Sequence, residues 1–145
     1  MRTKLNLAFQ FKENGAHIFT DITIFRKKFM ALVDTGATSS AFDLDFVKEH
    51  LGDKHLHLLD DKAGGLGSAD ILMFATELKF SLGEAKFKQN VALIDYSHIH
   101  QLYEMHGLQK FHFIIGNDIL VNNKAIINYQ TKTMSLELTG LKPKK

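Results

Sequence analysis

An aspartate at the end of a short apolar run is the residue best suited to chemistry in this chain. In "ALVDTGATSS", residues 31–40, the apolar segment stops at Asp34 and continues with small and hydroxylated residues. Most aspartates at strand ends cap the backbone amides of an ordinary turn. A carboxylate in this position can also act as general acid or base toward a water molecule. The rest of the chain has to distinguish these two roles.

Composition restricts the chemistry that the chain can perform. The sequence contains no cysteine, which excludes disulfides, thiol nucleophiles and thiolate metal sites. Carboxylates, histidines and hydroxyls remain. The formal net charge is +2 with charges of both signs interspersed, so we expect no nucleic acid partner. A chain of 145 residues has the length of one domain and is too short for two catalytic lobes. A site that needs two lobes would therefore need two copies of the chain.

The N-terminal segment "MRTKLNLAFQFKENG" alternates polar and apolar residues, unlike a signal peptide. No apolar run has the length of a membrane-spanning helix. From these two observations we expect no cleaved leader, no membrane association and a cytoplasmic location.

Hydrophobic periodicity predicts a mostly β domain with short helices. Alternation over residues 3–11 and 18–24, with Asn14-Gly15 between them, predicts a β-hairpin, and the next strand, 29–33, ends at Asp34. Further strands are expected at 55–59, 71–82, 85–94, 111–115, 125–129 and 134–138, helices at 43–51 and 97–106, and a turn at 119–121. We expect one domain over residues 1–139 and a disordered tail over 140–145.

Three motifs occur in an order that chance would seldom produce. They are Asp34-Thr35-Gly36-Ala37-Thr38-Ser39, the glycine-rich Gly64-Gly65-Leu66-Gly67, and "FIIGNDIL" at 113–120 followed by "AIINYQTKTMSLEL". With these motifs the chain resembles the retropepsin-like aspartic peptidases, the single-lobed relatives of pepsin, and their bacterial branch more closely than the retroviral one. The resemblance implies the single-lobe acid-protease fold, a closed β-barrel with short helices.

The resemblance also implies an aspartic endopeptidase with Asp34 as the catalytic residue. Such enzymes need two carboxylates that share one proton. No second Asp-Thr/Ser-Gly occurs in the chain, so the second carboxylate would be Asp34 of a twin subunit in a homodimer. Thr35 and Gly36 would support the active-site loop, Gly36 because a Cβ there would intrude on the carboxylate. The strands at 3–11 and 134–138 are expected to pair across the dimer axis.

Other residues take roles from the same resemblance. Ala37 stands where pepsin-type enzymes have serine, so one hydroxyl donor to the carboxylate is missing. The residues expected to contact substrate or form the flap that closes over a peptide are Ala37, Gly64, Gly65, Leu66 and Gly67. Ile114, Ile115 and Gly116 would pack beneath the site. Retroviral members commonly carry an aspartate where this chain has Thr38 and an arginine where it has Asn117, so an ion pair is absent here.

Two alternatives remain open at this stage. The first is a dimerisation or peptide-binding module that keeps this fold without turnover, because fold does not guarantee function. The second is a metal site built from some of the eight histidines, especially those at positions 50, 55, 57, 98, 100, 106 and 112. No cysteine and no His-Glu-x-x-His pattern accompanies them, and histidines on strand or helix surfaces are commoner than ligands. We therefore expect no metal ion and no cofactor.

Overall fold

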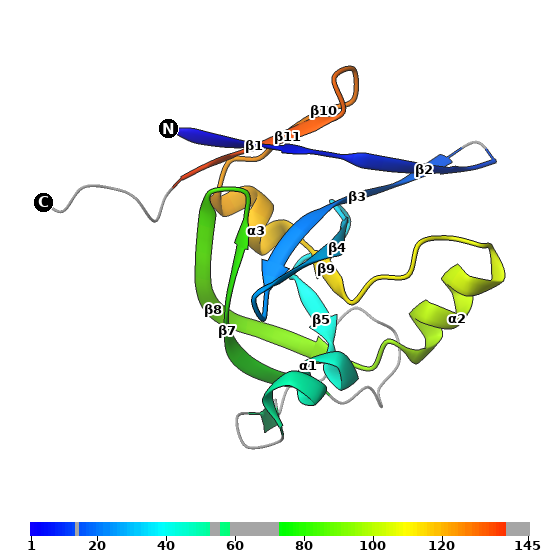
Figure 1. Ribbon diagram of the computed structural model, residues 1–145, viewed down its shortest axis with the longest axis vertical. Helices are drawn as coiled ribbons and strands as arrows, with labels where there is room; N and C mark the ends of the chain where they lie inside the picture. Colours follow the sequence, from blue (N-terminus) through cyan, green and yellow to red (C-terminus); the bar gives the residue numbers. More distant parts are fainter. Residues whose placement is uncertain (14, 53–55, 59–72, 139–145) are drawn as a thin grey trace, which may run out of the picture.

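A computed structural model describes residues 1–13, 15–52, 56–58 and 73–138 of the chain. Within these residues the chain consists mainly of β-strands, as the sequence predicts, with three short helices where the sequence predicts two (Figure 1). The strands are β1 (Arg2–Asn6), β2 (Ala8–Lys12), β3 (Gly15–Ile24), β4 (Lys27–Val33), β5 (Ala41–Asp43), β6 (His57–Leu58), β7 (Phe74–Leu82), β8 (Ala85–Ile94), β9 (Phe113–Ile115), β10 (Ile126–Asn128) and β11 (Thr133–Glu137). The helices are α1 (Leu44–Leu51), α2 (Ser97–Met105) and α3 (Asn117–Asn122).

Six strands close into a barrel in the order β3-β4-β9-β5-β8-β7, which confirms the predicted fold class. β4 and β9 pair in parallel, with Leu32 opposite Ile114 and Val33 opposite Ile115. The ring closes where β7 returns to β3, and among the described residues these two strands share the single register pair Thr23 and Ser81. We call this junction the barrel seam. β2 and β6 extend the sheet beyond the ring.

A second sheet, in the order β1-β11-β10, lies at one end of the barrel, at the top of Figure 1. The single strand predicted over residues 3–11 is wrong, because the chain leaves one sheet and enters the other at Leu7, whose amide donates to the carbonyl of Lys132 (2.9 Å). The two strands that the sequence analysis expects to pair across a dimer axis pair with each other within one chain. β1 pairs with β11 of the same chain, and β10 occupies the other edge of β11.

The two predicted helices are confirmed, and their ends follow from local chemistry. The Asp43 side chain caps the N-terminus of α1 by accepting a hydrogen bond from the amide of Asp45 (3.2 Å). Gly52, with φ of 76°, ends the same helix and donates to the carbonyl of Lys48 (2.8 Å). The predicted turn at 119–121 is instead part of α3. Burial of Ile119 and Leu120 in the core stabilises this short helix despite the modest helix propensity of its residues.

Two clusters of buried side chains hold these elements together. The larger one fills the barrel and reaches the three-stranded sheet through Met134 and Leu136. The smaller one lies between the barrel and α2 and comprises Phe19, Leu32, Tyr96 and Phe111, with Ile99 and Tyr103 packed against it. The Tyr96 hydroxyl donates to the carbonyl of Ala41. No helix in the described residues is long and apolar enough to cross a membrane.

Candidate active site

Asp34 lies directly after β4, where its amide donates to the carbonyl of Ile115 on β9 (3.0 Å). The chain then turns sharply. The amide of Gly36 donates to Asp34 Oδ1 (2.9 Å), and the amide of Ala37 donates to the carbonyl of Asp34 (3.1 Å). We call residues 34–39 the Asp34 loop. The loop holds a partly exposed carboxylate in a fixed orientation at the end of a buried strand.

Gly116, at the end of β9, packs directly against the Asp34 loop. A Cβ built at Gly116 would lie 2.7 Å from the carbonyl carbon of Ser39, 2.8 Å from its oxygen and 2.9 Å from the oxygen of Ala37. These are backbone atoms and cannot rotate away, so the close approach requires glycine. Asn117 adds two hydrogen bonds, from its amide to the carbonyl of Ala37 and from its side chain to that of Thr35 (both 2.8 Å). The Asp34 loop is therefore held from behind by residues 116 and 117.

Gly36 is less constrained than the sequence analysis expects. A Cβ at this position would lie 3.3 Å from Asp34 Oδ1, which is a tight contact but not a forbidden one. The carboxylate could accommodate it by moving a few tenths of an ångström. For the geometry of the Asp34 loop, the absence of a side chain therefore matters more at Gly116, which packs against the loop, than at Gly36 within it.

A hydrogen-bond network between Ser40 and Asp118 supports the loop from its other end. The hydroxyl and the amide of Ser40 both donate to Asp118 Oδ1 (2.7 and 2.9 Å), and the amide of Gly116 donates to the Ser40 hydroxyl (2.9 Å). Gln89 donates to the other oxygen of Asp118 (3.3 Å). The sequence analysis misses Ser40 and Asp118 as a pair. No local signal indicates the pair, because the two residues are 78 positions apart and the sequence predicts a turn where α3 lies.

Helix α2 brings a tyrosine into the electrostatic range of Asp34. The Tyr103 hydroxyl lies 3.1 Å from His17 Nδ1, and the two rings meet edge to face at 5.0 Å. Partial burial, and secondly the negative charge of Asp34, raise the pKa of the Tyr103 hydroxyl above its ordinary value. No sequence pattern indicates this proximity, because the residues lie on three elements far apart in the chain.

The remaining predicted site residues are placed as follows. Ile115 is fully buried beneath the loop and Ile114 is partly buried, while Thr35 is exposed. The flap residues Gly64, Gly65, Leu66 and Gly67 lie outside the described residues, as do His55 and the tail at 140–145.

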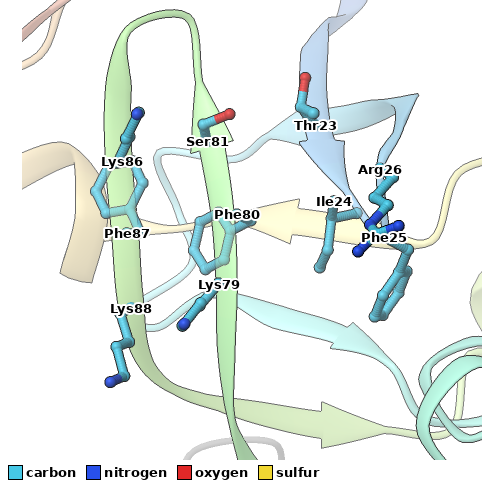
Figure 2. Close-up of a pocket in the computed structure, with 10 residues that line it drawn as sticks. All are labelled: Thr23, Ile24, Phe25, Arg26, Lys79, Phe80, Ser81, Lys86, Phe87 and Lys88. Carbon is cyan, nitrogen blue, oxygen red and sulfur yellow. The ribbon is translucent and has the colours of Figure 1, made fainter.

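A separate pocket of about 410 Å³ lies at the barrel seam, between the β3–β4 turn and the β7–β8 hairpin (Figure 2). Phe80 and Phe87 stack at 5.1 Å on the hairpin, and Ile24 and Phe25 lie opposite them. The basic side chains around these rings are Arg26, Lys79, Lys86 and Lys88. None of the ten residues drawn in Figure 2 belongs to the Asp34 loop, so this pocket is distinct from the candidate active site.

Comparisons with known proteins identify the fold. A scan against models of protein families finds no match, and neither does a search of curated proteins. Three solved structures resemble the chain over most of its length. A retropepsin-like aspartic protease from Rickettsia conorii has a TM-score of 0.54 and 14% identity, covering 94% of this chain and 90% of its own. The retroviral protease-like domain of Ddi1 from Leishmania major has a TM-score of 0.52 and 16% identity, covering 81% and 86%.

The third is EIAV protease in complex with the inhibitor HBY-793, with a TM-score of 0.54 and 18% identity, covering 82% of this chain and 99% of that one. Identities this low carry information about the fold alone. Three observations agree: the barrel is closed, the Asp34 loop lies at the end of β4, and these three solved structures are similar to the chain. The chain therefore has the retropepsin-like fold.

Proposed function

We propose that the protein is an aspartic endopeptidase that hydrolyses peptide bonds as a homodimer. The observation that carries this proposal is the setting of Asp34 in a retropepsin-like fold, at the end of β4 with Oδ1 bonded to the amide of Gly36. A carboxylate fixed in this way, and still partly exposed, is suited to proton transfer.

The proposed mechanism uses Asp34 from each of two copies. The two carboxyl groups share one proton, because two negative charges so close together resist simultaneous ionisation. The ionised group takes a proton from a water molecule while the protonated group donates to the carbonyl oxygen of the peptide. Water oxygen adds to the carbonyl carbon, the C–N bond then breaks, and the departing nitrogen receives a proton. The segment at 64–67 is proposed to cover the bound peptide and to exclude bulk water.

The residues beside Asp34 are proposed to act through position. Asn117 and Gly116 fix the backbone of the Asp34 loop, and Ala37 lines the site without a hydroxyl. Where the retroviral enzymes commonly have a charged pair, this chain has Thr38 and Asn117, and the Asn117 side chain bonds to the carbonyl of Thr35. We propose that peptide backbone is bound here through neutral groups.

The test is cleavage of a denatured protein over a range of pH, with and without a statine-type inhibitor. Asp34→Asn keeps the volume of the side chain and removes the base, so the rate should fall by about 10²- to 10⁴-fold with the fold unchanged. Asp21→Asn, an exposed change on the neighbouring β3, is the matched control and should retain full activity.

Inhibitable cleavage that depends on Asp34 would support the proposal. Undiminished turnover by Asp34→Asn would remove this residue from the mechanism. Binding of peptides without cleavage by the native protein would favour the alternative, a peptide-binding module on the same fold.

A further inference from the structure

Three side chains of metal-ligating type meet between the barrel and α2, outside the Asp34 loop. Asp43 Oδ2 lies 2.8 Å from His112 Nδ1 and 3.7 Å from His100 Nε2. One ligand atom from each of the three residues lies within 4.8 Å of the others. The sequence analysis groups His100 and His112 with other histidines and expects no metal, because neither cysteine nor a His-Glu-x-x-His pattern accompanies them. The structure adds the carboxylate to the two imidazoles.

The barrel itself brings Asp43 and His112 together. β5 and β9 run antiparallel with Phe42 opposite Phe113, so the next positions along the two strands are Asp43 and His112. The amide of Asp43 donates to the carbonyl of His112 (2.8 Å), which fixes this register at the backbone. The pair is therefore set by the sheet.

The third residue comes from α2, which is anchored over the same edge of the barrel. Tyr96 precedes the helix, is almost fully buried and donates to the carbonyl of Ala41. The ring of Tyr96 meets the ring of His100 edge to face at 5.4 Å, and the His100 and His112 rings lie nearly perpendicular at 5.3 Å. On the other side, Phe46 stacks on His112 at 3.9 Å. Packing thus orients both imidazoles before any ligand binds.

The surroundings favour a cation that arrives from solvent. The three residues line a pocket of about 190 Å³, and Asp45, Glu49 and Lys110 are also among its lining residues. The pocket is therefore lined by three carboxylates, those of Asp43, Asp45 and Glu49, and by one ammonium group, that of Lys110. The Asp43 side chain is 6% exposed and the two histidines are 23% exposed, so the carboxylate is shielded while the imidazoles remain accessible. In these surroundings a positive ion is attracted and the carboxylate is held in place.

We propose that Asp43, His100 and His112 bind a zinc ion, with water as the fourth ligand. Two imidazole nitrogens and one carboxylate oxygen suit zinc better than the oxygen-seeking ions magnesium and calcium. Ligand atoms about 2.0 Å from a tetrahedral zinc ion are roughly 3.3 Å apart, which lies between the two separations from Asp43 Oδ2. The three ligand atoms lie within 4.8 Å of one another, so binding requires side-chain rotations that move them to this spacing.

Binding replaces hydrogen bonds with bonds to the metal and requires both imidazoles to be neutral. Zinc takes His112 Nδ1 and His100 Nε2. In the hydrogen-bonded arrangement these nitrogens carry the ring protons, because they face a carboxylate and a carbonyl oxygen, so each neutral ring moves its proton to the other nitrogen when the ion binds. His100 Nε2 lies 2.8 Å from the carbonyl of Phe111, and the zinc-bound water becomes the donor to that oxygen. The ion then links α2, which has no fully buried side chain of its own, to β5 and to the chain before β9.

The test measures binding of zinc and cobalt to the tag-free protein. Titration calorimetry with zinc should give one site per chain, and cobalt should give the strong visible absorption of a tetrahedral complex. Zinc should also raise the thermal unfolding midpoint, and a chelator should reverse the increase. His100→Gln and His112→Gln should each weaken zinc binding at least about tenfold.

Asp43→Asn separates the site from the fold, because an amide oxygen still caps α1 while a charged ligand is lost. It should also weaken zinc binding and abolish the cobalt absorption. Controls are His98→Gln and His106→Gln, which change exposed histidines of the same region, and a double change of His55 and His57 to Gln. Controls that bind like the native protein support the proposal. The proposal is overturned if the native protein does not bind zinc, or if the Asp43, His100 and His112 variants bind it as tightly as the native protein does. Loss of zinc binding in the controls also overturns the proposal.

Discussion

Gly116 illustrates how one missing side chain determines the geometry of the Asp34 loop. In Gly116→Ala the new Cβ would meet backbone atoms of Ser39 and Ala37 at distances of 2.7 to 2.9 Å. Overpacking against backbone destabilises proteins by about 1–3 kcal/mol, so we predict a loss of this size in the free energy of unfolding. Urea denaturation monitored by circular dichroism measures it.

Gly15→Ala is the matched control for this prediction. The nearest atom to a Cβ at Gly15 is the carbonyl oxygen of Lys12, 4.0 Å away. Its stability should stay within about 0.5 kcal/mol of the native value. Equal stability of the Gly116 and Gly15 variants would show that β9 does not press against the Asp34 loop.

At the scale of elements, α2 places Tyr103 beside His17 and within electrostatic range of Asp34. Burial, and then Asp34, raise the pKa of the Tyr103 hydroxyl, so the folded protein keeps this proton to higher pH than the unfolded chain does. The resulting stability is fully present below about pH 10, the ordinary value, and is lost as the pH rises through the folded-state value.

We therefore predict that Tyr103→Phe reduces the decline of stability as the pH rises above about 10. Loss of the hydrogen bond to His17 should lower the free energy of unfolding by a similar amount throughout this pH range. The slope of stability against pH therefore separates the titration of Tyr103 from the loss of this hydrogen bond. Urea midpoints measured against pH provide both quantities. A slope equal to that of the native protein would contradict the assigned surroundings of Tyr103.

Elements with strong local signals were predictable from the sequence. Helix α1 has a capping aspartate and a terminal glycine, and β8 matches the predicted bounds of 85–94. The Asp34-Thr35-Gly36 motif identifies the candidate site for the same reason, since its residues are contiguous.

Features that depend on tertiary contacts were not predictable. The short strand β5 has its partners in β8 and β9, distant in the chain, and α3 is stabilised by burial of residues that locally suit a turn. The break at Leu7 follows from competition between two sheets for one continuous alternating segment. Asp43 looks like a cap in the sequence, and only the β5–β9 register places it beside His112.

For the whole molecule, the proposed function requires two copies, because the chain carries one Asp-Thr-Gly motif. Specific activity should fall on dilution below the dissociation constant of the dimer. Activity assays over a dilution series, compared with molecular mass from analytical ultracentrifugation, measure this directly. Constant specific activity from a species of monomer mass would refute the dimeric mechanism while leaving the fold unaffected.

At the barrel seam the ring of strands is closed by a single described register pair, so a disulfide placed there would link β3 and β7 covalently. β7 and β8 share nine register pairs, whereas the described parts of β3 and β7 share only Thr23 with Ser81. Because the chain has no cysteine, a double change of Thr23 and Ser81 to Cys would introduce one defined disulfide. By restricting the long intervening loop in the unfolded chain, it should stabilise the oxidised form by up to about 4 kcal/mol over the reduced form. Comparison of thermal unfolding with and without reductant measures how far the stability of the ring depends on this junction.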